Sequence, residues 1–209
     1  MEKLEAFILI GGRSSRLGTD KAFVELGGAT LIEHAISNVA GGLPGAKLTM
    51  VAGSSTQFAI EAITSGVPFI FDLYEARGPL GGLHAALAYA KTPWVFVLAC
   101  DYPFVSPELI RLLSEKIVAG FGAVVPEQND RRLQPLCAFY NVAAARPIVE
   151  GILERPRVSP PIHEIVAMLD PFIVRFEDYE HLERAGELFL NINTAEDLDR
   201  ARRRVRRDR

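Results

Sequence analysis

Hydrophobic residues follow two different periods along this chain. Short runs rich in Val, Ile and Phe alternate with longer stretches whose apolar positions are three and four residues apart. The first pattern is typical of buried strands and the second of helices that pack on a sheet. Their alternation favours βαβ units. The sequence therefore predicts a single domain over residues 1–209, with a three-layer α/β/α Rossmann-like fold and a mainly parallel mixed sheet.

The pattern also predicts where the elements lie. Strands are expected at residues 6–10, 47–52, 68–72, 94–100, 122–126 and 172–176, and helices at 29–40, 56–66, 81–91 and 106–120. Ser106 is expected to cap the fourth of these helices and Thr194 a last, arginine-rich helix. RLQPLCAFYN, residues 132–141, predicts a further strand whose proline places it at an edge or a bulge. RPRVSPP, residues 155–161, predicts a loop between two helices.

Composition narrows the function classes. The chain is 49% hydrophobic and has a net charge of −3, from 23 Lys and Arg against 26 Asp and Glu. Such a balance disfavours nucleic acid as a partner, and the arginine-rich end is expected to be a solvated helix face. No apolar run reaches the roughly 18 residues of a membrane span, so we expect a cytoplasmic protein without a membrane contact. Cys100 and Cys137 lie in apolar surroundings and are expected to be buried free thiols.

The stretch FILIGGRSSRLGTDKAFVEL, residues 7–26, leads from an apolar run into two glycines and several cations. This order puts Gly11 and Gly12 at the carboxyl end of the first strand, where ligands of open α/β sheets bind. Glycine lets backbone N–H groups approach a phosphate, and Arg13, Arg16 and Lys21 can add charge-assisted hydrogen bonds. The spacing is neither the GxGxxG fingerprint nor a P-loop. The stretch predicts a polyphosphate-binding loop of another kind.

Two aspartates follow predicted strands. Asp101 comes after WVFVLAC and Asp72 closes PFIFD, so both carboxylates are expected at the carboxyl edge of the sheet. Oxygen ligands suit Mg²⁺, which makes Asp101 a candidate metal ligand. A carboxylate at Asp72 can accept from both N1–H and the exocyclic amino group of guanine, a donor pair that adenine lacks. The alternative for each is a residue that stabilises a turn.

GGRSSRLGTDK, together with Leu9 before it, resembles the LAGGxxxRMGxDK signature of the molybdenum cofactor guanylyltransferases, a family within the nucleotidyltransferase superfamily. The matching residues are Leu9, Gly11, Gly12, Arg16, Gly18, Asp20 and Lys21, while Ile10 replaces an alanine and Leu17 a methionine. FDLYEARGPLGGL, LACDYPFVSPELI, RLQPLCAFY and NINTAEDL resemble further segments of the family, with Ala195 in place of a proline. The resemblance extends over nearly the whole chain.

The resemblance implies transfer of GMP from GTP to the terminal phosphate of molybdopterin, with Mg²⁺ as cofactor and pyrophosphate as product. It implies catalytic roles for Arg16, Lys21 and Asp101, nucleotide contacts at Leu9, Gly11, Gly12, Lys21, Asp72 and Asp101, and metal ligation by Asp101 and Asn193. Asn191 is the alternative second metal ligand. Transient contact with proteins that deliver or accept the cofactor is compatible with this activity.

Two other functions stay open at this point. VAGSS, residues 51–55, lacks the asparagine that some members place against the base. A cytidylyltransferase that uses CTP, on molybdopterin or another phosphorylated acceptor, is therefore an alternative. A nucleotide-binding regulator without turnover is another, and it would bind GTP without releasing pyrophosphate.

Overall fold

The computed structural model describes residues 4–10, 21–53, 66–74, 77–155 and 160–207. Its centre is a seven-stranded sheet in the order β5-β4-β1-β6-β8-β7-β9. The strands are β1 (Glu5–Leu9), β4 (Lys47–Ala52), β5 (Phe69–Phe71), β6 (Trp94–Ala99), β7 (Ala123–Pro126), β8 (Cys137–Asn141) and β9 (Phe172–Val174). Only β8, among these, pairs antiparallel with its neighbours. The predicted mainly parallel mixed sheet is confirmed.

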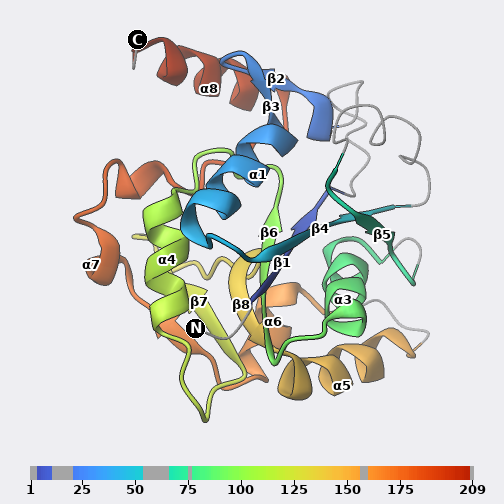
Figure 1. The fold of residues 1–209 in the computed structure, drawn as a ribbon. Helices are drawn as coiled ribbons and strands as arrows, with labels where there is room; N and C mark the ends of the chain where they lie inside the picture. Colours follow the sequence, from blue (N-terminus) through green and yellow to red (C-terminus); the bar gives the residue numbers. More distant parts are fainter. Residues whose placement is uncertain (1–3, 11–20, 54–65, 75–76, 156–159, 208–209) are drawn as a thin grey trace.

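Helices cover both faces of this sheet (Figure 1). On one face lie α1 (Leu31–Gly42) and α4 (Pro107–Glu115), whose apolar side chains share a core with β1 and β6. On the other face lie α3 (Pro79–Tyr89), α5 (Val142–Leu153) and α6 (Ile162–Ala167), which share a second core. The inner strands β1, β6, β7 and β8 are almost wholly buried, as their continuous apolar runs predict, whereas the edge strands β5 and β9 are partly exposed. Both cysteines are buried and form no disulfide, as expected.

The strand that follows Pro135 does not lie where the sequence predicted it. We expected residues 132–141 at an edge or a bulge, but β8 lies inside the sheet, between β6 and β7. The strand begins at Cys137, so Pro135 precedes it and removes no hydrogen bond from the ladder. The Pro135 carbonyl instead accepts a hydrogen bond from the buried Tyr140 hydroxyl, at 2.6 Å.

A β-hairpin that the hydrophobic pattern did not predict directly precedes α1. Strands β2 (Glu25–Leu26) and β3 (Ala29–Thr30) form a separate two-stranded sheet, turned by Gly27 and Gly28, which both have positive φ. Thr30 then caps α1 through a reciprocal pair with Glu33. The last helix, α8 (Ala195–Arg207), packs on this hairpin (Figure 1): a Cβ on Gly27 would lie 2.8 Å from Val205 Cγ1.

The remaining described elements are short. They are η1 (Lys21–Phe23), α7 (Phe176–Tyr179) and η2 (Ala185–Glu187). The predicted N-cap Ser106 is confirmed, because its hydroxyl accepts from Leu109 N–H at 3.2 Å. The helix predicted at 56–66 falls almost wholly on residues 54–65, outside the described residues.

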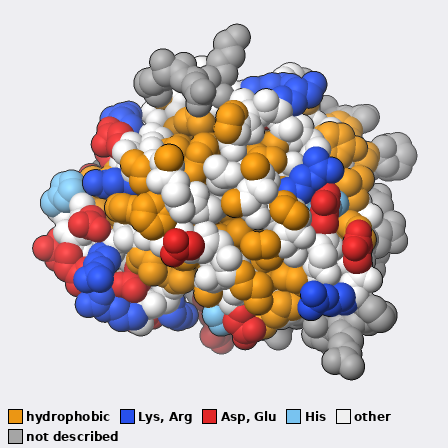
Figure 2. Space-filling model, turned by 90° about the horizontal axis from the view of Figure 1, so that it is seen from below, with side chains coloured by type: hydrophobic (Ala, Val, Ile, Leu, Met, Phe, Trp, Pro, Cys, Tyr) orange, Lys and Arg blue, Asp and Glu red, His pale blue; other side chains and the backbone are white. Residues whose placement is uncertain are grey.

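The surface seen from below Figure 1 carries hydrophobic side chains in several patches, with acidic and basic groups both present around them (Figure 2). None of the described helices has the length and apolar character that a membrane crossing requires.

Candidate functional site

The carboxyl ends of the parallel strands bring the predicted site residues to one edge of the sheet. Leu9 ends β1, Asp72 directly follows β5, and Asp101 lies two residues beyond β6. Since β1 pairs with β6 and β4, and β4 pairs with β5, all parallel, these strand ends lie along the same edge of the sheet. The other predicted loop residues, Gly11, Gly12 and Arg16, lie outside the described residues.

Lys21, in η1, links Asp101 to the far end of the chain. Its Nζ lies 3.7 Å from Asp101 Oδ2 and donates a hydrogen bond to Asn193 Oδ1. Asn193 is 172 residues from Lys21 in the sequence. The structure thus brings together three residues that the resemblance put in the site. Asn191 has an exposed side chain, so Asn193 is the better placed of the two asparagines.

The start of α8 holds Asn193 in place. Asp197 Oδ2 accepts from the backbone N–H groups of Asn193 at 3.1 Å and Thr194 at 3.0 Å, and from the Thr194 hydroxyl at 2.9 Å. Thr194 Oγ1 in turn accepts from Asp197 N–H at 3.1 Å. In addition, the Asp101 carbonyl accepts from Ile192 N–H at 3.1 Å. Sequence reasoning found Thr194 but missed Asp197, although T-x-x-D before a helix is a capping-box pattern.

The donor set at this position fits a magnesium ion. A carboxylate oxygen of Asp101 and the amide oxygen of Asn193 both face one cationic group, the Lys21 ammonium. Mg²⁺ prefers oxygen ligands and takes one or two protein groups, with phosphate and water completing its shell. Within the described part of the chain, no three His, Cys, Asp or Glu side chains converge. A metal held here would take its remaining ligands from phosphate oxygens and water.

Burial and charge act in opposite directions on Asp101. Burial raises the pKa of its carboxyl group, and the neighbouring Lys21 ammonium lowers it by a smaller amount. The two side chains are mostly shielded, with exposed fractions of 22% for Asp101 and 19% for Lys21. A cation at this position therefore stabilises a carboxylate that burial otherwise disfavours.

Asp72 lies against the first turn of α3. A Cβ on Gly81 would lie 3.4 Å from Asp72 Oδ2 and 2.9 Å from the Tyr74 carbonyl oxygen, so a side chain there would displace this segment. A Cβ on Gly82 would lie 3.6 Å from Asp72 Oδ1 and 3.3 Å from the methyl groups of Leu9. Burial raises the pKa of the Asp72 carboxyl group to about 6. Two glycines, an apolar side chain and a carboxylate therefore lie next to one another at the end of the sheet.

A polar network begins at Tyr102, the residue after Asp101. The Tyr102 hydroxyl donates to Gln134 Oε1 at 3.1 Å, and Gln134 Nε2 donates to Gln128 Oε1 at 2.7 Å. Gln134 is buried, and the next residue but one, Leu136, accepts from Ala99 N–H through its carbonyl. The network fixes the segment that follows β7 beside the end of β6.

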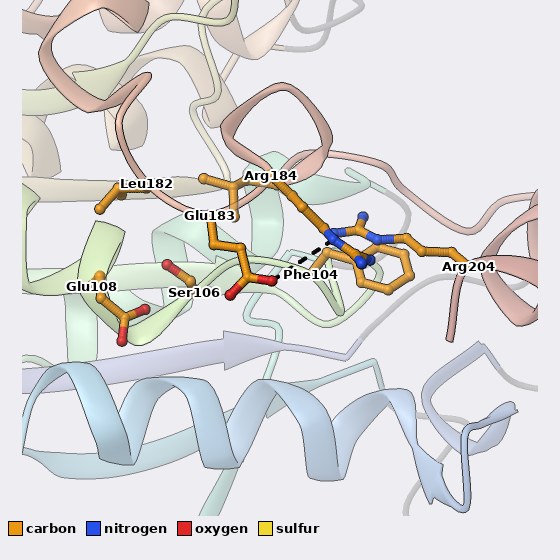
Figure 3. Close-up of a pocket in the computed structure, with 8 residues that line it drawn as sticks. Phe104, Ser106, Glu108, Leu182, Glu183, Arg184 and Arg204 are labelled. Carbon is orange, nitrogen blue, oxygen red and sulfur yellow. Dashed lines mark ion pairs between the residues drawn. The ribbon is translucent and has the colours of Figure 1, made fainter. Parts of the chain in front are cut away.

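A cavity of about 440 Å³ is lined by the start of α4, the segment 182–188 and Arg204 of α8 (Figure 3). Its lining residues are Phe104, Ser106, Glu108, Leu182, Glu183, Arg184, Leu188 and Arg204. The Arg204 guanidinium stacks on the Phe104 ring, 3.8 Å from its centroid.

Both arginines of this cavity lie near acidic side chains. Arg204 Nε lies 3.1 Å from Glu187 Oε2, and Arg184 Nε lies 3.9 Å from Glu183 Oε1. We expected the arginines of the last helix to be solvated, but the Arg204 side chain is only 13% exposed. The contacts of Arg204 with Phe104 and Glu187 anchor α8, and with it Asn193.

Comparison with known proteins identifies a family of nucleotidyltransferases. Residues 6–159 match a family described as the MobA-like NTP transferase domain. A Bacillus cereus protein named "Probable molybdenum cofactor guanylyltransferase" is 30% identical over 205 residues, which are 97% of this chain and 98% of that protein.

Solved structures agree with the fold. The crystal structure of molybdopterin-guanine dinucleotide biosynthesis protein A from Archaeoglobus fulgidus is 28% identical, with a TM-score of 0.80 over 97% of this chain and 99% of that one. The 2-C-methyl-D-erythritol 4-phosphate cytidylyltransferase from Thermus thermophilus is 18% identical, with a TM-score of 0.66 over 98% of this chain and 99% of that one. The second likeness shows the fold alone.

Proposed function

This chain belongs to the MobA-like NTP transferase family, and on that premise we propose that it transfers GMP from GTP to the terminal phosphate of molybdopterin, releasing pyrophosphate. Family membership makes the chain a nucleotidyltransferase of molybdenum cofactor biosynthesis. The observation that supports the finer proposal is the convergence of Lys21, Asp101 and Asn193 at the same sheet edge as Asp72.

Asp72 would select the base. Its ionised carboxylate can accept from guanine N1–H and the exocyclic amino group together. Leu9 and Gly82 lie beside it. The pKa of about 6 leaves the carboxylate ionised near neutral pH. Acidification below about pH 6 would protonate Asp72 and remove one acceptor, so GTP affinity would fall.

The reaction asks for alignment and charge rather than acid or base catalysis. The terminal phosphate of molybdopterin is already ionised near neutral pH, so the attack on the α-phosphorus needs no general base. Asp101 and Asn193 would hold Mg²⁺, which when bound neutralises negative charge on the phosphate oxygens. Lys21 would donate to the phosphates and stabilise charge that moves towards pyrophosphate. Arg16, outside the described residues, is proposed to share this role.

A thermal-shift experiment with GTP, CTP, ATP and UTP, each with and without Mg²⁺, tests nucleotide choice. A ligand at 100 times its dissociation constant stabilises by about 2.7 kcal/mol, or roughly 5 to 10 °C for a domain of this size. We expect the largest shift with GTP and Mg²⁺, followed by pyrophosphate release when molybdopterin is added. A larger shift with CTP would overturn the guanine assignment in favour of a cytidylyltransferase. Tight GTP binding without pyrophosphate release would instead favour a regulator.

A further inference from the structure

The Lys21 ammonium lies where a metal ion would have to bind. It contacts Asn193 Oδ1 and lies 3.7 Å from Asp101 Oδ2, and these two side chains are the proposed metal ligands. We propose that Lys21 is an internal cation that occupies the Asp101–Asn193 site of the free protein, and that it leaves when nucleotide phosphates attract it. This inference rests on the proposed function, because the metal concerned is the one that nucleotidyl transfer would use.

The ammonium and a divalent ion cannot use these oxygens at the same time. Magnesium–oxygen bonds are only about 2.0 to 2.1 Å long, so a bound ion would lie within the space that Lys21 Nζ takes between the two side chains. Two like charges at such a short distance also repel each other strongly in a partly buried site. Metal binding to the free protein must therefore displace Lys21.

Lys21 is the group of the three that can move. Asn193 is fixed by the Asp197 capping interactions and by the backbone bond from Ile192 to Asp101. Asp101 follows a buried strand of the sheet centre. Lys21, by contrast, carries its charge on a flexible four-carbon stem and lies in η1, a helix of three residues.

The arrangement sets an order of binding. Phosphate groups that arrive with the nucleotide offer Lys21 new anionic partners, and its departure frees both oxygens for the ion that accompanies the nucleotide. The metal should then bind poorly to the free protein and well as a metal–nucleotide complex. The same lysine serves first as a substitute cation and then as a phosphate contact.

Titration with Mn²⁺, followed by electron paramagnetic resonance without nucleotide, measures this competition directly. The test protein is Lys21→Met, which keeps a long unbranched side chain, one atom shorter, and removes its charge. The matched control is Lys91→Met, which makes the same change in net charge at an exposed lysine before β6, while Asp101 lies beyond the other end of that strand. A double variant, Lys21→Met with Asp101→Asn, reports where the ion binds. Thermal melts check folding, and Lys21→Gln replaces the methionine variant should that one fail to fold.

We expect Lys21→Met to bind Mn²⁺ at least tenfold more tightly than the wild type, Lys91→Met to match the wild type, and the double variant to lose the gain. Equal affinity in Lys21→Met and the wild type would overturn the inference, as would a gain that survives Asp101→Asn. The wild-type transfer assay reads the proposed function separately. A gain in Mn²⁺ affinity in a protein that transfers no GMP to molybdopterin would support the cation exchange and reject the proposed reaction.

Discussion

Replacing Asp72 by asparagine should stabilise the protein against unfolding and lower its affinity for GTP. The substitution keeps the shape of the side chain and removes a charge that lies, partly buried, against the first turn of α3. Burial raises the pKa of this carboxyl group from 3.8 to about 6. At 1.36 kcal/mol per pKa unit, ionising Asp72 costs the folded state about 3 kcal/mol at neutral pH. Asparagine avoids this cost.

The sign of the pH dependence follows from the same shift. Because the pKa is higher in the folded than in the unfolded state, the folded state binds more protons between about pH 4 and pH 6. The cost is therefore absent at low pH, grows through that window, and is constant above it. At pH 5 it has reached only about half of its full value. The stability gain of Asp72→Asn should be about twice as large at pH 7.5 as at pH 5.

Thermal melts of the two proteins measure this difference. Partial solvent exposure reduces the gain, so we expect 1 to 2 kcal/mol at pH 7.5, or roughly 2 to 8 °C for a chain of this length. Asp199→Asn, which removes a charge from an exposed position on α8, is the control and should change stability by less than about 0.5 kcal/mol. With GTP and Mg²⁺ added, the thermal shift of Asp72→Asn should shrink, since the loss of a charged hydrogen bond weakens affinity by about tenfold to a hundredfold.

Two results would refute this reasoning. Equal melting temperatures for wild type and Asp72→Asn at pH 7.5 would show that the carboxylate carries no burial cost. A gain of the same size at pH 5 and pH 7.5 would show that the stabilisation has a cause other than ionisation. An unchanged GTP shift in the variant would separately remove Asp72 from base recognition.

Three further predictions concern metal, phosphate and packing. Lys21→Ala should lower turnover about a hundredfold, because a lost charge-assisted contact costs roughly 3 kcal/mol and each 1.4 kcal/mol is about tenfold in rate. A steady-state pyrophosphate assay measures this, and a loss below about threefold would exclude Lys21 from the mechanism. Asp101→Asn should fold, yet its GTP thermal shift should no longer respond to Mg²⁺; an unchanged magnesium response would reject Asp101 as the ligand. Gly42→Ala should lower the free energy of unfolding by about 1 to 3 kcal/mol in denaturant melts, because its Cβ would lie 2.7 Å from Ile110 Cβ; unchanged stability would mean that α1 and α4 separate easily.

The sheet could be predicted from sequence because its inner strands are buried on both faces and therefore appear as continuous apolar runs. Asp72 and Asp101 were predictable for the same reason, since a polar residue directly after such a run lies at the carboxyl edge. The place of β8 was not, because one proline two residues before the strand looked like part of it. The β2–β3 hairpin was missed because two-residue strands are too short to show a period, although a Gly-Gly pair is a known hairpin turn.

Asn193 shows what periodicity cannot supply. No local pattern links it to Lys21, 172 residues away, and its predicted role came from family resemblance alone. What brings the two together is tertiary structure: the capping box at the start of α8, the packing of that helix on the β2–β3 hairpin, and the stacking of Arg204 on Phe104. A site built from residues so far apart in the sequence depends on tertiary packing, which the spacing of residues within a motif does not reveal.

The two roles inferred for Lys21 can be measured separately, because loss of the lysine should lower turnover and raise metal affinity. As a phosphate contact, Lys21 lowers the barrier, so its loss should reduce turnover about a hundredfold. As a substitute cation, it competes with metal, so its loss should raise Mn²⁺ affinity in the free protein at least tenfold. A lysine that only stabilised the fold would lower melting temperature without raising metal affinity, and one that only bound phosphate would leave the metal titration unchanged. Only a residue that exchanges Asp101 and Asn193 for phosphate gives slower turnover together with tighter metal binding.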